Sequence, residues 1–140
     1  HIVEFKRAHL EGGQICLLLE YCEAGSLERL LSQVGAFPEE TARACTVQVL
    51  SALQYMHMVG LVHFDVKPGN LLISRENTVK LCDFGNSRWV SSYTQGTLLG
   101  TVAYLAPEIA RREAAGRKAD VWSLGATVME LLTAHRPFLR

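Results

Sequence analysis

A run of apolar residues at positions 61–72, LVHFDVKPGNLL, carries polar side chains that could do chemistry: His63, Asp65, Lys67 and Asn70. Polar groups in apolar surroundings cost free energy unless each has a partner or a task. A further carboxylate, Asp83, follows the stretch VKLC. Carboxylates, an amide and an ammonium together suit phosphoryl transfer, because that reaction depends mainly on positioning and charge stabilisation.

The spacing of these residues predicts that they share one pocket. Asp65 and Lys67 are two positions apart, so in an extended segment they point to the same side. A turn at Pro68-Gly69 brings Asn70 back toward Asp65, and Asp83 ends a strand that pairs with the one after Asn70. Oxygen ligands from Asn70 and Asp83 favour Mg²⁺. Lys67 would neutralise a transferring phosphoryl group, which leaves Asp65 to accept or orient a hydroxyl proton.

The surrounding elements must hold these loops. Residues 2–7 and 14–20 read as an antiparallel hairpin, and residues 27–33 as a short helix. Pro38 with acidic neighbours starts a helix of roughly twenty residues that ends near Gly60. Two short strands, LLIS and VKLCDF, form a second hairpin, and residues 86–100 form a long loop. Residues 119–133 form an apolar helix, which we expect to be buried on every side, with Trp122 in the core. The order predicts an α+β fold.

Composition excludes several partners. The 140 residues have a formal net charge of +0 and are 49% hydrophobic, so no charge bias points to nucleic acid or acidic lipid. No apolar run approaches membrane-spanning length. The cysteines, Cys16, Cys22, Cys45 and Cys82, form no C-x-x-C pair and have no histidine at zinc spacing. They read as single apolar residues in a reducing compartment, which predicts a cytoplasmic, intracellular location.

Ordered motifs along essentially the whole chain carry a family resemblance. HFDVKPGN is followed by DFG at 83–85, APE at 106–108 and DVWSLG at 120–125. This order resembles eukaryotic protein kinases. The resemblance implies a partial kinase-like bilobal fold, with small-lobe strands in residues 1–20, the hinge in 20–26 and the large lobe in 27–140, through the buried central helix.

The resemblance also assigns roles. It implies that Asp65 is the catalytic base, that Lys67 contacts the γ-phosphate of ATP, and that Asn70 and Asp83 hold Mg²⁺. Thr101 would bond the catalytic Asp and Lys. It implies that Leu19 is the gatekeeper and that Leu72 packs beneath the adenine ring. The hinge that pairs with adenine would be formed by Glu20, Tyr21 and Cys22. Asp120 would hydrogen-bond the backbone around His63, while His63 and Phe84 would stack as structural residues.

Lys67-Pro68 together with Thr101 resembles serine/threonine kinases rather than tyrosine kinases. The stretches LLEYCEAGSL and KADVWSLGATVMELLT are most similar to the Ste group, and within it to MAP kinase kinase kinases. The implied partners are ATP and a protein substrate, with a downstream kinase as one candidate. Two alternatives stay open: a pseudokinase that serves as a binding scaffold, and a small-molecule kinase of the aminoglycoside or choline type, against which the APE and DVWSLG segments weigh.

Two departures from the family pattern matter. Phe64 stands where most such kinases have an arginine that binds a phosphate on the activation loop, so activation by loop phosphorylation is in doubt or is anchored elsewhere, for example by Arg88. Ser91, Ser92, Thr94 and Thr97 are phosphosite candidates by position. The glycine-rich loop, the strand lysine and its glutamate partner are missing, so the chain is expected to be a central fragment that is inactive alone. Cys82, beside Asp83, is expected to border the nucleotide pocket and to react with electrophilic ligands.

Overall fold

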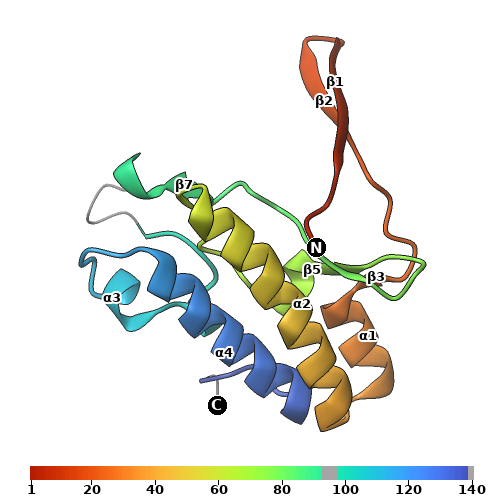
Figure 1. The fold of residues 1–140 in the computed structure, drawn as a ribbon, viewed down its shortest axis with the longest axis vertical. Helices are drawn as coiled ribbons and strands as arrows, with labels where there is room; N and C mark the ends of the chain where they lie inside the picture. Colours follow the sequence, from red (N-terminus) through yellow and green to blue (C-terminus); the bar gives the residue numbers. More distant parts are fainter. Residues whose placement is uncertain (93–97, 139–140) are drawn as a thin grey trace.

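A computed structural model describes residues 1–92 and 98–138. A helical body carries a long two-stranded hairpin that stands away from it (Figure 1). The hairpin consists of β1 (Phe5–Glu11) and β2 (Gln14–Leu19). Gly12 and Gly13 have φ values of 57° and 81° and make the two-residue turn between the strands, since a type I′ turn needs positive φ at both central residues.

The first strand was predicted at residues 2–7, and those bounds are wrong. The strand starts at Phe5 and continues to the turn at Glu11. Residues before it pair elsewhere, because Ile2 bridges Leu81 and the Val3 amide donates to the Leu81 carbonyl at 3.0 Å. This parallel contact joins the start of the chain to the helical body.

The helices pack side by side in the body. Helix α1 (Leu27–Val34) begins at Ser26, whose hydroxyl accepts from the Arg29 amide, and the long α2 (Glu39–Met58) follows Pro38 as predicted. Helix α4 (Arg117–Thr133) runs beside α2, and the short α3 (Pro107–Ala110) precedes it (Figure 1). Buried apolar side chains from α1, α2 and α4 and from strands β5 (Leu71–Ile73) and β6 (Val79–Leu81) form one core, with Leu53, Met56, Leu124 and Leu131 among them.

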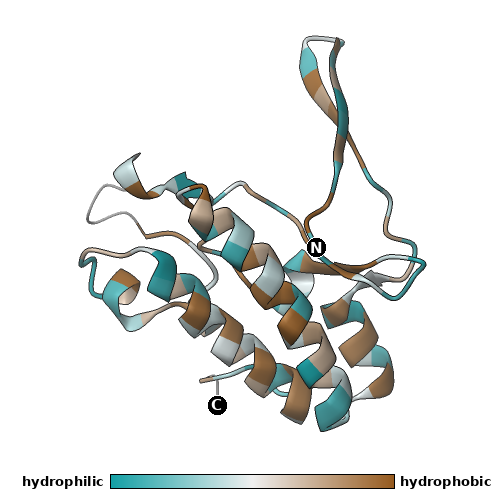
Figure 2. Cartoon of the chain, viewed as in Figure 1, coloured by the Kyte–Doolittle hydropathy of each residue, from teal (hydrophilic) through white to brown (hydrophobic). Residues whose placement is uncertain are grey.

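The prediction that α4 is buried on every side, with Trp122 in the core, is wrong. The face toward α2 is buried, but Val121 is 56% and Trp122 44% exposed. Figure 2 shows the apolar residues along this helix. Within the described part of the chain, α2 and the Val102–Tyr104 turn cover α4, and one stripe of the helix stays exposed. The Trp122 ring lies outside the core and stacks on Phe138, with ring centroids 6.2 Å apart.

Short strands frame the candidate site. Strands β3 (Gly25–Ser26), β5 (Leu71–Ile73) and β6 (Val79–Leu81) form an antiparallel sheet, and the register pairs Leu71 with Leu81. Strand β4 (Leu61–Val62) pairs with β7 (Arg88–Trp89), which lies inside the segment predicted as loop. Short 3₁₀ turns occupy Pro68–Asn70, Val90–Ser92 and Val102–Tyr104. No helix in the described residues is long and apolar enough to cross a membrane. The predicted α+β class is confirmed.

Candidate active site

Asp65 is the centre of a dense hydrogen-bond cluster in residues 63–70, which we call the catalytic loop after the family resemblance. Its side chain is only 5% exposed. The Lys67 ammonium donates to Asp65 Oδ2 at 2.9 Å, and the Thr101 hydroxyl donates to Oδ1 at 2.7 Å. Lys67 Nζ also lies 2.7 Å from Thr101 Oγ1. These contacts close a triangle across 36 residues of sequence.

Two amides complete the surroundings of this carboxylate. Asn70 Nδ2 donates to the Asp65 carbonyl at 2.8 Å and to Oδ2 at 3.1 Å, and Asn86 Nδ2 lies 3.4 Å from Oδ2. The Asn86 contact was not foreseen, because no motif spacing marks it. Burial alone would raise the pKa of Asp65, but the hydrogen bonds from Lys67, Thr101 and Asn70 outweigh burial and lower that pKa. Asp65 is therefore an ionised, fully oriented carboxylate at neutral pH.

Asn70 and Asp83 lie at the same end of the β5–β6 hairpin. Asn70 immediately precedes β5, and the Cys82 amide donates to the Asn70 carbonyl at 3.0 Å. Asp83 follows Cys82, is exposed, and has a positive φ of 62°. With the Asn70 amide nitrogen turned toward Asp65, an amide oxygen and a carboxylate are the groups left to ligate. This all-oxygen donor set fits Mg²⁺, which prefers carboxylate and carbonyl oxygens.

The backbone of the catalytic loop is held by hydrogen bonds to Asp120 of α4. Its buried carboxylate accepts the His63 amide at 2.9 Å and the Phe64 amide at 2.7 Å. His57 Nε2 lies 2.8 Å from the same carboxylate, a contact that sequence spacing did not reveal. These bonds hold Phe64 at φ 64°, a conformation that costs a bulky residue about 1–3 kcal/mol.

His63 lies where the family resemblance placed it, next to Phe84. The two rings meet edge to face with centroids 5.3 Å apart. His63 Nε2 lies 3.1 Å from the Cys82 carbonyl oxygen, and the Asp65 amide donates to Nδ1 at 3.2 Å. Burial lowers the pKa of His63 and outweighs the nearby carboxylates, so the ring is neutral. A neutral, packed ring supports a structural role.

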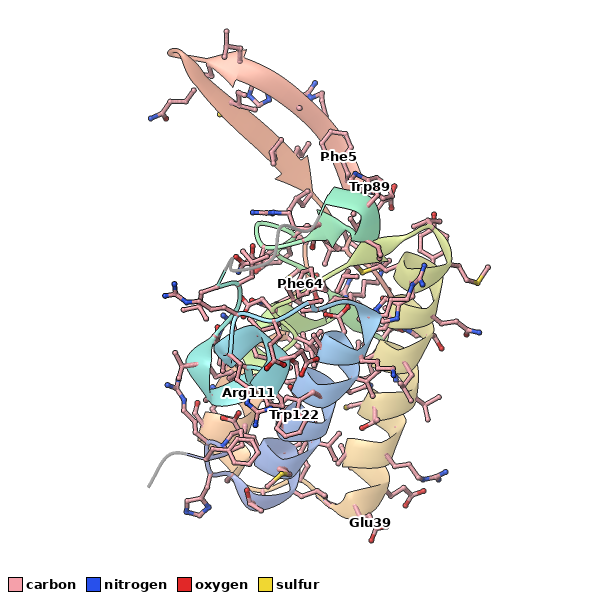
Figure 3. The ribbon with its side chains drawn as sticks, turned by 90° about the vertical axis from the view of Figure 1, so that its left-hand side faces the viewer. Phe5, Glu39, Phe64, Trp89, Arg111 and Trp122 are labelled. Carbon is pink, nitrogen blue, oxygen red and sulfur yellow. The ribbon has the colours of Figure 1, made fainter. Side chains whose placement is uncertain are left out.

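Phe64, the residue that departs from the kinase pattern, is 2% exposed. It lies in an apolar cluster that joins β4, the catalytic loop, the segment from 99 to 109 and α4, with members Val62, Leu99, Ala106, Ile109 and Ala119. Figure 3 shows its side chain inside the body. Gly100, at φ +102°, approaches so closely that a Cβ there would lie 2.4 Å from the Phe64 carbonyl oxygen. Apolar packing therefore holds residues 99–109 against the loop.

Arg88 was suggested as an alternative anchor for a phosphorylated loop, and four nearby hydroxyl residues as phosphosites. Arg88 Nη1 donates to the backbone carbonyls of Gly85 and Ser87, at 3.2 and 2.8 Å. Thr94 and Thr97 lie outside the described residues, as does the side chain of Ser92.

The residues assigned to adenine are more dispersed. A cavity of about 600 Å³ lies between the hairpin and the Asp83 segment, with Leu17, Leu19, Cys82 and Asp83 in its lining. Glu20, Cys22 and Leu72 do not line this cavity. Glu20 is in an ion pair with Lys80, and Cys22 is buried. Leu72 is half-buried in β5, with Ser26 and Lys80 as its strand neighbours.

Cys82 borders this cavity, but its thiol is a poor nucleophile. Burial, with a further contribution from the Asp83 charge, raises its pKa to about 11. Since the thiolate is the reactive form, alkylation of Cys82 at neutral pH is disfavoured.

Comparison with known proteins agrees with this geometry. A family model described as "Protein kinase domain" matches residues 1–140. The chain is 35% identical over 138 residues to Cell division control protein 7 of Schizosaccharomyces pombe, which covers 99% of the chain and 13% of that protein. It is 44% identical over 131 residues to serine/threonine-protein kinase PknL of Mycobacterium tuberculosis, covering 91% and 33%. Mitogen-activated protein kinase kinase kinase A of Dictyostelium discoideum is 35% identical over 140 residues, covering 99% and 15%. These relatives differ in kind, so the similarity does not single out the Ste group.

Proposed function

The chain belongs to the protein kinase family, and from this premise we propose that the full-length protein transfers the γ-phosphate of ATP to a serine or threonine hydroxyl of a protein substrate. The observation that carries the proposal is the closed triangle of Asp65, Lys67 and Thr101. It orients a buried carboxylate and places a cation beside it, as phosphoryl transfer requires.

Each residue of the site has a proposed task. Asp65 accepts or orients the proton of the substrate hydroxyl, and Lys67 neutralises charge on the γ-phosphate. Thr101 fixes both groups through its hydroxyl. Asn70 and Asp83 are proposed to hold Mg²⁺. When bound, this ion supplies positive charge to the phosphate oxygens. Asp120 acts through the backbone of the catalytic loop and so keeps Asp65 in place.

The nucleotide is proposed to lie between the hairpin and the β5–β6 sheet. Leu19 would be the gatekeeper, Glu20 and Cys22 the hinge, and Leu72 the floor beneath adenine. Residues 1–20 then correspond to small-lobe strands, 20–26 to the hinge and 27–140 to the large lobe. The position of Leu19 on the wall of the cavity that also reaches Asp83 supports this arrangement.

The finer proposal is a place in a MAP kinase-type cascade, with a downstream kinase as substrate. It rests on the Ste-like stretches of sequence and on two relatives whose names include "mitogen-activated protein kinase", at 32% and 35% identity. The relatives of the chain also include kinases outside such cascades by name, among them Cell division control protein 7 and PknL. Phosphorylation of a purified MAP kinase kinase, compared with a generic substrate, tests the cascade role separately from the activity.

The test of the activity follows label from γ-labelled ATP to a generic protein substrate, followed by phosphoamino acid analysis. The full-length protein is compared with Asp65→Asn, which removes the carboxylate without changing its shape. Glu40→Gln, an exposed change on α2, is the matched control. We expect label on serine or threonine, a loss of about 10²–10⁴-fold in Asp65→Asn, and no change in the control.

Two results would contradict the proposal. Transfer that survives Asp65→Asn would remove Asp65 from its role. No transfer from a folded, ATP-supplied full-length protein would favour the scaffold alternative.

A further inference from the structure

We propose that the hairpin β1–β2 carries a zinc-binding site formed by His9, Glu11 and Cys16. Among residues 1–92 and 98–138, these side chains form the group of three potential ligands whose donor atoms all lie within 4.8 Å of one another. The site lies on the hairpin, apart from Asp65 and its neighbours, and is independent of the proposed phosphotransfer.

The turn of the hairpin brings the three residues together. The two-residue turn at Gly12-Gly13 sets the register, which pairs His9 with Cys16 and Glu11 with Gln14. Directly opposed residues have Cβ atoms about 4.5–5.5 Å apart. Glu11 is two positions after His9 on the same strand, so it faces the same side. All three ligands thus lie on one face near the tip.

The nitrogen–oxygen distance matches a tetrahedral zinc ion, and the sulfur lies close enough to complete the set. His9 Nε2 is 3.4 Å from Glu11 Oε2, and Cys16 Sγ is 4.0 Å from the same oxygen. Zinc bonds of about 2.0–2.3 Å place tetrahedral N and O ligands about 3.3 Å apart, and S and O ligands about 3.5 Å apart. The oxygen–sulfur distance would shorten by about half an ångström on binding. The His9 nitrogen and the Cys16 sulfur lie within 4.8 Å of each other, and they would come to about 3.6 Å apart.

The chemistry of the three donors selects the metal. A thiolate, an imidazole and a carboxylate suit a borderline-soft ion such as Zn²⁺, whereas Mg²⁺ prefers oxygen ligands alone. Access is open, since the side chains of His9 and Glu11 are 45% and 76% exposed. The other face of the hairpin carries Leu10, Ile15 and Leu17. The fourth position of the zinc is left to water, as in other three-ligand zinc sites.

Sequence spacing could not show this site, because its ligands come from opposite strands rather than from a C-x-x-C or H-x-x-x-H turn. Once bound, the metal would cross-link β1 to β2 across the tip. It would also occupy the Cys16 sulfur and protect it from alkylation.

The test uses the full-length protein, freed of metal with a chelator and titrated with Co²⁺ as a spectroscopic probe and then with Zn²⁺, in excess Mg²⁺. We expect a thiolate-to-cobalt absorption band that Zn²⁺ displaces. Cys16→Ser should abolish the band. His9→Ala should weaken binding at least about tenfold, since loss of even an outer partner of a metal site costs 10–100-fold. Gln14→Ala, on the same face at the tip, is the matched control and should bind unchanged.

A second measurement does not depend on spectra or on how well the variants fold. Mass spectrometry of the unaltered protein should show slower alkylation of Cys16 with Zn²⁺ than with Mg²⁺. The proposal is overturned if the unaltered protein gives no cobalt band, if the band persists in Cys16→Ser, or if Zn²⁺ leaves the alkylation of Cys16 unchanged.

Discussion

Replacing Phe64 with alanine should lower the free energy of unfolding by more than a substitution at an exposed position does. The ring is 2% exposed and joins the catalytic loop to the segment that carries Leu99 and Ile109. Removing it leaves a cavity at the meeting point of these elements. We expect both the stability and the phosphotransfer activity of the full-length protein to fall.

The magnitude follows from burial. A fully buried phenylalanine changed to alanine costs about 3–5 kcal/mol. The positive φ of 64° gives no compensation, because alanine at that φ carries a similar strain. Phe64→Leu keeps most of the apolar volume and should cost about 1.5 kcal/mol or less. Since domains have about 5–15 kcal/mol of total stability, the alanine change removes a large share of it.

Urea denaturation of the full-length protein and its variants measures this loss. Tyr55→Ala, which removes an exposed ring on α2, is the control and should stay within about 0.5 kcal/mol of the unaltered protein. A loss below about 1 kcal/mol for Phe64→Ala, with an unchanged m-value, would refute the role of Phe64 as the apolar anchor of residues 99–109.

Other changes test the neighbouring contacts. Asp120→Ala leaves the two backbone amides it binds without an acceptor, at about 1–3 kcal/mol each; Asp120→Asn keeps one acceptor oxygen, so denaturation should show a smaller loss. Gly100→Ala places a methyl group 2.4 Å from the Phe64 carbonyl oxygen, so it should lower both the melting temperature and kcat; an unchanged melting temperature would contradict this close approach. Alkylation of Cys82 should accelerate with pH up to about 11, because the raised pKa keeps the thiol protonated at neutral pH; a rate that levels off near pH 8.5, the ordinary range of a cysteine, would be inconsistent with that burial. Phosphatase treatment should leave the activity unchanged, since apolar packing holds residues 99–109; a clear drop in the kinase assay would argue for a phosphate anchor.

Local signals predicted much of the fold. Pro38 and the spacing of apolar residues after it marked α2, and the paired glycines at 12 and 13 marked the hairpin. The contacts of Asp65 with Lys67, Asn70 and Thr101 could also be anticipated from motifs of known order, whereas that with Asn86 could not. What these signals lack is information on partners distant in sequence.

The errors and omissions have that common cause. Trp122 belongs to an apolar helix, yet which face of a helix is covered depends on the elements that pack against it. The contact between His57 and Asp120 spans 63 residues and has no spacing rule. In the same way, His9 meets Cys16 only through strand register. Phe64 could be identified as unusual, but its burial depends on residues 99–109.

The anchoring of the catalytic loop by Asp120 has a consequence for the order of folding. The amides of His63 and Phe64 bind an acceptor that lies 57 and 56 residues later in the chain. At a synthesis rate of about 5–20 residues per second, the ribosome makes this loop about 3–11 s before its anchor. Until α4 has emerged, the nascent loop lacks the Asp120 acceptor that holds Phe64 at positive φ. We therefore expect the Asp65 cluster to assemble late in folding, after residues 117–133 have been made.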